Sequence, residues 1–319
     1  MIIKIDNEEN IGKRLDSFLV EYFKNEYSRK NICDFIAEKE VLINFKKAKS
    51  SSKLKLNDEI SIDEVELDKF LNPTQALEPY NYKLDIVYED EDLAIINKPK
   101  NMLTHPTKFD RKNTLANALL YNFKNLSSVQ GEDRRGIVHR LDKNTAGLIL
   151  IAKNDKAHID LAKQIKEKSA RRKYLAIALG EFNEKEGTIN KPLVHYMKDN
   201  VKMTVAPEGL EAITHFKVVE EYKGATLVEL ELETGRTHQI RAHLASINHP
   251  IFNDSLYGAK SFMRNEFYNL KTTEQLLQSY YIKFKQPTTG ETLEFQLSEE
   301  EFSEDFIKVL NFLRRKNNV

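Results

Sequence analysis

The sequence predicts an α+β protein, in which a mixed, mainly antiparallel sheet with flanking helices follows a small N-terminal α+β module. Short apolar runs typical of strands are interspersed with stretches of helical periodicity. Most links between successive strands are shorter than the dozen or so residues that a parallel crossover requires. The 319 residues suffice for two domains, one of them with a sizeable core.

Residues 1–66 have the pattern of a compact unit with its own small core. We expect two helices followed by two short strands, over residues 11–22, 28–39, 41–45 and 59–63. Ser28 is a suitable N-cap for the second helix, because its hydroxyl can accept a backbone hydrogen bond from the first turn. Residues 67–82 contain two prolines and show no clear period, so we expect a linker there and a second domain over residues 83–319.

The second domain is expected to intersperse strands with helices. Two strands are predicted within residues 82–99, and others over residues 148–152, 173–180 and 225–235. The run LILIA at 148–152 is continuously apolar, which is typical of a strand covered on both faces. Helices are predicted over residues 155–169, 237–247 and 303–316, with Thr237 and Ser303 as candidate N-caps.

The net charge is zero, which argues against a generic nucleic-acid binder, but the charges are unevenly distributed. Residues 24–55 hold nine Lys or Arg against four Asp or Glu, and residues 134–173 hold twelve against four. Such clusters can build a positive face on a neutral protein, and an ordinary solvated surface is the alternative for each.

The start of the chain has no apolar signal-peptide core, and no apolar run approaches the roughly 18 residues of a membrane helix. The single cysteine, Cys33, excludes an internal disulfide framework and a multi-cysteine metal site. We interpret it as a buried or half-buried thiol in a helix. These features predict a cytoplasmic protein with no membrane partner.

The stretch GIVHRLDKNTAGLILIAKN at 136–154 places Asp142 in a polar turn between apolar strands, close to His139, Arg140 and Lys143. A turn on a rigid scaffold exposes its carboxylate, and cationic neighbours favour the ionised form, which suits a nucleophile or an electrostatic stabiliser. A structural role is the alternative, in which Asp142 caps a helix, stabilises the turn or pairs with Arg140 or Lys143.

Four segments resemble, in the same order, the signature motifs of the RNA pseudouridine synthases of the RluA/RluD type. They are IINKPKNMLTHP at 95–106, HRLDKNTAGLILIAKN at 139–154, RRKYLAIALGE at 171–181 and LETGRTHQIRAHLASINHPIFNDSLYG at 232–258. Together they cover most of residues 84–260. Two departures, Ala146 for the usual serine and Asn253-Asp254 for the usual glycine-aspartate, do not touch the expected catalytic residues.

The resemblance implies that the protein isomerises uridine to pseudouridine in RNA. The base is detached from its ribose, rotated and rejoined through a ring carbon, so no cofactor, metal or energy source is implied. By resemblance, Asp142 is the essential carboxylate, either as a nucleophile or as the base that forms a glycal. Tyr174 would stack against the base and assist proton removal from it. Arg236 would pair with Asp142 and hold it ionised, and Ile240 would pack against the uracil.

Uridine in folded RNA is stacked, so the resemblance also implies base flipping, which costs a few kcal/mol of unstacking. Arg140 occupies the position that enters the vacated stack, and His139 supports that loop. Further candidates for contacts with the RNA are Lys143, Arg171, Arg172, Lys173 and Arg241.

Residues 1–66 resemble the small RNA-binding module of small-subunit ribosomal protein four. Its candidate RNA contacts lie at the start of the second helix and between the strands: Arg29, Lys30, Lys46 and Lys47. The chain has Asn44-Phe45 where the module usually has Asn-Gly, a departure within a loop that would contact RNA.

Large-subunit ribosomal RNA is the expected substrate, transfer RNA is the second candidate, and no obligate protein partner is implied. A non-catalytic RNA-binding or ribosome-assembly factor would be favoured by loss of Asp142, Tyr174 or Arg236, and all three are present. A glycoside hydrolase needs two acids that flank one bond, whereas this signature supplies one acid among cations. No metal site is expected, because His238, His243 and His249 lack the i, i+4 spacing and intervening glutamate of a helical zinc site.

Overall fold

The computed structural model describes residues 1–24, 26–39, 41–71, 76–107, 110–196, 202–258, 270, 272 and 274–317. The chain divides into two compact units, Met1–Ala76 and Leu77–Val319, and each has its own hydrophobic core. Within the described ranges, no helix has the length and apolar character needed to cross a membrane.

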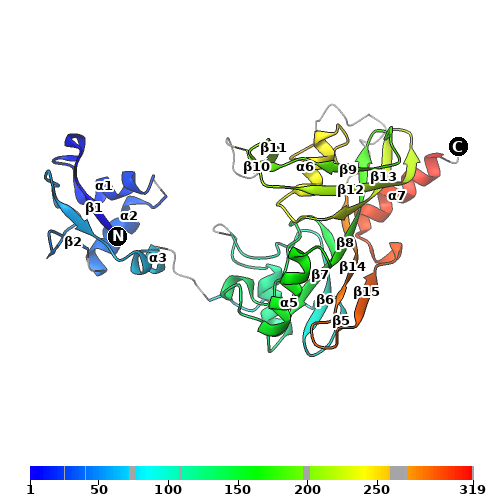
Figure 1. Ribbon diagram of the computed structural model, residues 1–319, viewed down its shortest axis with the longest axis horizontal. Helices are drawn as coiled ribbons and strands as arrows, with labels where there is room; N and C mark the ends of the chain where they lie inside the picture. The colour runs from blue at the N-terminus through cyan, green and yellow to red at the C-terminus, as the bar shows by residue number, and fades with distance from the viewer. Residues whose placement is uncertain are drawn as a thin grey trace. The chain divides into compact units, whose positions relative to one another are not determined.

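The first unit is a four-stranded antiparallel sheet, in the order β1-β4-β2-β3, that shares one core with its helices (Figure 1). Its elements are β1 (Ile2–Lys4), η1 (Glu8–Asn10), α1 (Leu15–Tyr22), α2 (Arg29–Glu38), β2 (Leu42–Ile43), β3 (Lys46–Lys47), β4 (Glu59–Ser61) and α3 (Glu64–Leu71). The predicted N-cap is confirmed, because the Ser28 side chain accepts a hydrogen bond from the Asn31 backbone N–H.

Part of the predicted linker is helical. Helix α3 covers Glu64–Leu71, and its Leu67 is buried in the core of the first unit. Residues 72–75 lie outside the described part of the chain, while Tyr80 and Tyr82 pack against the core of the second unit. The expectation of an aperiodic segment was therefore wrong at its start, because Leu67 and Phe70 follow helical spacing before the first proline.

The second unit is built on a nine-stranded sheet, and the predicted mixed, mainly antiparallel class is confirmed. The order is β5-β6-β7-β14-β8-β13-β12-β9, with β15 paired to β14 outside this path. Every pair is antiparallel except β7 with β14. The strands are β5 (Ile86–Glu89), β6 (Leu93–Lys98), β7 (Ala146–Ala152), β8 (Arg171–Leu179), β9 (Glu186–Asn190), β12 (Ile213–Tyr222), β13 (Ala225–Leu232), β14 (Leu277–Lys285) and β15 (Thr292–Gln296), and a separate pair is β10 (Leu193–His195) with β11 (Met203–Val205).

Helices cover both faces of the central part of this sheet, so β6, β7, β8 and β14 are largely buried on both sides (Figure 1). The helices are α4 (Leu115–Asn122), η2 (Glu132–Arg134), α5 (Asp155–Lys166), α6 (Gln239–Ser246), η5 (Glu299–Glu301) and α7 (Glu304–Asn317). Leu161 of α5 and Phe306 of α7 share one core with Leu148, whereas α4 and α6 pack on the opposite face around Ile149. The run LILIA is fully buried, as predicted.

Helix α6 begins one residue later than a Thr237 N-cap would place it. Its N-cap is His238, in the left-handed conformation at φ 52°, and no side chain caps the first turn from that position. Instead, the Gln239 side chain folds back and its Oε1 accepts hydrogen bonds from Arg236 N and Thr234 Oγ1. The expectation of Thr237 as the N-cap was wrong, because this amide holds the preceding turn.

Strand β14 joins two halves of the sheet. It lies between β7, which follows the turn with Asp142, and β8, which carries Tyr174. Gly147 of β7 is paired with Ser279 of β14 and has φ +113°. A Cβ at Gly147 would lie 1.9 Å from the Ser279 carbonyl oxygen, so only glycine fits at this junction.

We expect Gly147→Ala to lower the free energy of unfolding by about 3 kcal/mol or more, because β14 would have to move away from β7. Gly290→Ala is the matched control, since Gly290 also has a positive φ, +74°, but has open space around it. It should cost only about 1–2 kcal/mol of backbone strain. Urea denaturation measures both, and equal losses would show that the close approach is unimportant.

Candidate active site

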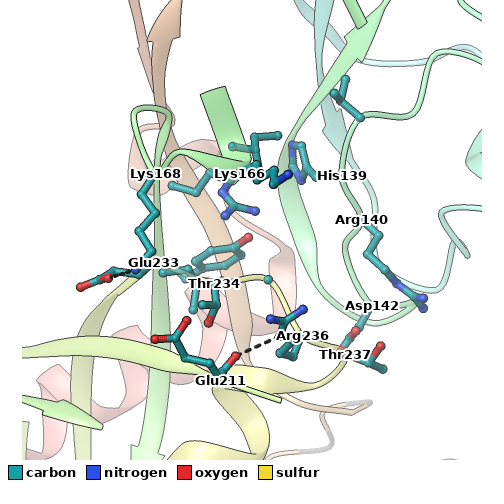
Figure 2. A pocket seen from close by; sticks show the side chains of 16 residues that line it. His139, Arg140, Asp142, Lys166, Lys168, Glu211, Glu233, Thr234, Arg236 and Thr237 are labelled. Atoms are coloured by element: carbon teal, nitrogen blue, oxygen red, sulfur yellow. Dashed lines mark hydrogen bonds and ion pairs between the residues drawn. The ribbon is translucent and has the colours of Figure 1, made fainter. Parts of the chain in front are cut away.

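Asp142, Tyr174 and Arg236 line one cavity of about 380 Å³ (Figure 2). A second cavity of about 50 Å³ shares these three residues and is also lined by Ile240 and Arg241. Asp142 comes from the turn before β7, Tyr174 from β8 and Arg236 from the segment before α6, and the fold brings the three to one cavity. The contacts within this site differ from those expected.

The turn that carries Asp142 is held by the segment that follows β6. Thr104 Oγ1 donates to the Leu141 carbonyl at 2.6 Å and lies 3.2 Å from the Leu141 N–H, which donates to it. The fully buried Lys98 ammonium donates to the carbonyls of Pro99, Met102 and, at 3.3 Å, Lys143. The motif IINKPKNMLTHP therefore fixes the backbone on both sides of Asp142.

Burial lowers the pKa of Lys98 to about 7, and the negative charge of Asp142 opposes this shift. The ammonium is the form that donates to three carbonyls at once, so its protonation supports the turn. The sequence places this lysine in the motif at 95–106 and does not indicate its role. Its structural role is seen only from the three carbonyl groups that accept its hydrogen bonds.

Asp142 is paired with Arg241. Nη1 of Arg241 donates to Oδ2 of Asp142 at 3.2 Å, and the carboxylate is 15% exposed. The same guanidinium donates from Nε and Nη2 to the two oxygens of the buried Asp254, at 2.7 and 2.9 Å. Burial alone would lower the pKa of Arg241, but the hydrogen bonds and charges of Asp254 and Asp142 outweigh it and raise that pKa.

The prediction of an ion pair between Arg236 and Asp142 was wrong. Nε of Arg236 donates to the Glu211 carbonyl at 2.9 Å, and Figure 2 shows its side chain turned that way. Arg236 precedes α6 in an exposed loop, whereas Arg241 lies within the helix on its buried side. The prediction of Arg241 as an RNA contact is corrected too, because its guanidinium is buried between two carboxylates.

Two further aromatic groups at the site are uncharged at neutral pH. Burial raises the pKa of Tyr174, so its phenol keeps its proton. Burial, together with the charge of Arg172, lowers the pKa of His139 to about 3. Nε2 of His139 accepts a hydrogen bond from the Leu150 N–H at 3.0 Å, a contact that supports the loop before Asp142.

The remaining candidates on β8 do not all face the cavity. Arg171 and Lys173 point to the other side of the strand, where they pair with Glu231 and Glu229 of β13. They are therefore paired surface residues and not contacts at the reacting base. Arg172 shares the face of Tyr174 and lines the cavity.

The three histidines considered for a metal site serve separate contacts. His243 hydrogen-bonds to Thr214 Oγ1 and the Lys191 carbonyl, and His249 to the Leu179 carbonyl. Nε2 of His238 lies 3.9 Å from Oδ2 of Asp142, and burial lowers its pKa. No group of three or more His, Cys, Asp and Glu side chains in the described ranges is arranged to hold a metal ion.

Comparison with known proteins identifies the family. Residues 92–246 match the family described as RNA pseudouridylate synthase. The chain is 36% identical over 312 residues to an uncharacterized RNA pseudouridine synthase of Bacillus subtilis strain 168, with 97% of each chain covered. The chain belongs to the RNA pseudouridine synthases. The predicted isomerase class is thereby confirmed.

Other relatives of this synthase carry more specific names. It is 35% identical to the ribosomal large subunit pseudouridine synthase D of Haemophilus influenzae, over 96% of this chain and 93% of the relative. This chain is 38% identical to the protein of the same name from Escherichia coli K12, over 80% of this chain and 75% of the relative. The solved structure of human RNA pseudouridylate synthase domain containing 1 has a TM-score of 0.55 at 24% identity, covers 74% of this chain and 97% of its own, and supports the fold.

In this synthase the geometry leaves one carboxylate oxygen of Asp142 available. Arg241 and His238 approach Oδ2, and Oδ1 has no hydrogen-bond donor among the described residues. Ile240 is buried at the edge of the smaller cavity, beside Tyr174. Arg140 and Lys143 are exposed, and Arg140 lines both cavities.

In the first unit, the candidate RNA contacts fall into two groups. Arg29 is 57% exposed and lies 3.1 Å from the buried carboxylate of Asp16, which Arg14 also approaches at 2.9 Å. Hydrogen bonds from Arg14 and Arg29 lower the pKa of Asp16 against the effect of burial. Lys30, Lys46 and Lys47 are exposed and have no ion-pair partner within the described ranges.

We expect Arg241→Gln to lower turnover of this synthase about a hundredfold, since a misplaced catalytic group can cost that much. It should also lower the free energy of unfolding by about 3–5 kcal/mol, because two carboxylates would be left buried without a cation. Single-turnover assays on unmodified RNA and thermal denaturation measure the two effects. Arg236→Gln is the control. It should lower turnover less than tenfold and change the free energy of unfolding by about 1 kcal/mol. The reverse ranking would restore Arg236 as the partner of Asp142.

Proposed function

We propose that this synthase isomerises specific uridines of large-subunit ribosomal RNA in the cytoplasm, with Asp142 as the essential carboxylate. The observation that carries the proposal is the ion-paired carboxylate of Asp142 beside the Tyr174 ring in one cavity. The ribosomal target is supported by the relatives named ribosomal large subunit pseudouridine synthase D, which align over 75–93% of their length. Transfer RNA is the second candidate, and no cofactor or protein partner is required by this chemistry.

The reaction that we propose uses the residues in three roles. Oδ1 of Asp142 faces the extruded nucleoside, either as a nucleophile or as the base that forms a glycal, while Arg241 holds Oδ2. The Tyr174 ring and Ile240 enclose the base, and because burial keeps Tyr174 protonated, stacking is its main contribution. The exposed Arg140 fills the stack that the flipped base has left.

Pseudouridine mapping across total RNA, with and without the gene, tests the target directly. Loss of specific sites in the large-subunit RNA is expected when the gene is deleted. Loss confined to transfer RNA would replace the substrate proposal and leave the chemistry intact. An unchanged map, together with inactive purified protein on unmodified transcripts, would contradict the proposed substrate.

Asp142→Asn should abolish pseudouridine formation and leave RNA affinity within about threefold, because the amide has the same shape and lacks the ionised oxygen. The neutral amide also weakens the contact with Arg241, so a modest change in melting temperature is expected. The control is Asp133→Asn, whose carboxylate pairs with Arg111 outside both cavities. Turnover that survives in the Asp142 variant would remove this residue from the mechanism.

We also propose that the first unit, residues 1–76, binds RNA through the turn between β2 and β3. Asn44 and Phe45 form this two-residue turn with φ of 50° and 64°, a conformation that favours Asn-Gly. Phenylalanine is strained there and its side chain is 86% exposed, so it does not serve the core. Lys46 and Lys47 follow it, and an aromatic ring flanked by cations suits an unpaired RNA base next to its phosphates.

Phe45→Gly should therefore weaken RNA binding about 5- to 100-fold, the range expected for loss of one stacked base. The same change should leave the stability equal or raise it by about 1 kcal/mol, since glycine relieves the positive φ. Filter binding and thermal denaturation of the full chain measure both effects. Phe45→Tyr, which keeps the ring, serves as the control and should bind normally. Equal affinity of the glycine variant would exclude stacking by this residue.

A further inference from the structure

One charged side chain at the active site has no partner. Arg172 of β8 is 5% exposed, and its Nε is buried without a hydrogen-bond acceptor. Within the described ranges its guanidinium makes no hydrogen bond or ion pair with any other residue. The two cations beside it on the strand do have partners, since Arg171 pairs with Glu231 and Lys173 with Glu229. The unpaired cation is the one that faces the active-site cavity.

An arrangement of this kind is costly in the free protein. Arginine does not deprotonate in proteins, so burial cannot be relieved by loss of charge. An ion removed from water without a counter-ion destabilises a fold by several kcal/mol. Buried polar groups without partners are rare, and strain of this sort is characteristic of functional sites. The missing partner should therefore be an anion that arrives from outside.

The surroundings of Arg172 indicate where that anion would sit. Arg172 and Tyr174 are two residues apart on one strand face, so their side chains start about 7 Å from each other. Gly235 lines the cavity next to Arg172, where a Cβ would lie in ordinary contact at 3.5 Å from Nη1. The shared cavity of about 380 Å³ is within the size range of small-ligand sites.

The other charges of the cavity do not neutralise Arg172. Lys168 pairs with Glu233, as Figure 2 shows, and Asp142 is held by Arg241. Lys166 also lines the cavity, is exposed, and has no partner in the described part of the chain. The lining also includes Arg140, Arg236 and the carboxylate of Glu211, so its five cations exceed its three carboxylates and leave an excess of positive charge.

We propose that Arg172 binds a phosphate of the RNA backbone next to the target uridine, with Lys166 as an outer contact. A phosphodiester supplies the missing negative charge, and its two free oxygens match the planar guanidinium fork. A uracil carbonyl is neutral and would leave the charge uncompensated. This assignment rests on the proposed function, because it places the extruded nucleotide between Tyr174 and Asp142. Arg172 is a substrate-binding residue that positions the nucleotide and takes no part in bond breaking.

Arg172→Met tests the proposal, because methionine keeps an extended apolar side chain and removes the charge. RNA affinity should fall about ten- to a hundredfold, which corresponds to the loss of a charged hydrogen-bonded contact. The dependence of log K on log salt should become shallower by about one unit. The melting temperature should stay the same or rise, since an uncompensated buried charge is gone. A variant that unfolds, or melts several degrees lower, would show a structural role and overturn the proposal.

Two further measurements separate this proposal from the proposed function. Uridine 3′,5′-bisphosphate at millimolar concentration should raise the melting temperature of the wild type more than uridine does, and this difference should vanish in Arg172→Met. The experiment needs no turnover, so it can succeed or fail independently of the RNA target and of Asp142. Arg171→Met is the matched control and should keep the bisphosphate effect, because Arg171 faces the other side of β8. Equal stabilisation of the wild type and Arg172→Met by the bisphosphate would exclude the phosphate site.

Discussion

The active site depends on a guanidinium that bonds to two carboxylates at once. Arg241 meets Asp254 through two hydrogen bonds and Asp142 through a third, so one buried cation balances two acids. Asp254 has no exposed side-chain surface and anchors the arginine, which in turn holds one oxygen of Asp142. An ion pair in such surroundings is favourable only with good geometry and a full set of hydrogen bonds. The orientation of the Asp142 carboxylate therefore depends on a buried arginine and on the carboxylate of Asp254 that anchors it.

Helix α6 and the segment after β6 complete this arrangement from opposite sides. Two consecutive residues in the first turn of α6, Ile240 and Arg241, place an apolar side chain at the smaller cavity and supply the partner of Asp142. Lys98 and Thr104 fix the carbonyls and amide of the turn itself. The site is thus preorganised by backbone contacts as much as by the residues in the cavity.

The fold class and the strands were largely predictable, because hydrophobic periodicity is a local property. The apolar run of β7, the Ser28 cap of α2 and the alternation along β13 all follow from short stretches of sequence. Asp142 and Tyr174 were assigned through flanking motifs, and the cavity brings them together as expected. Helix α3 was missed because nearby prolines outweighed a short helical pattern.

The partner of Asp142 could not be read from the sequence. Arg236 and Arg241 belong to one motif, and the choice between them depends on where α6 begins and which way its first turn faces. The resemblance assigned the pair to Arg236, whereas Gln239 holds the turn before α6 and leaves Arg236 in the loop. Lys98 and Asp254 were missed for the same reason, since their roles arise from contacts between distant segments.

The central place of β14 has a consequence for the order in which the enzyme forms. Asp142 lies in the turn before β7 and Tyr174 lies on β8, and the sheet joins these two strands through β14, residues 277–285, which are synthesised after both. The first unit, by contrast, has its core entirely within residues 1–76 and can fold while the rest is still being made. A nascent chain that lacks β14 therefore carries Asp142 and Tyr174 without the strand that joins their parts of the sheet. The site can be completed only after β14 has been made.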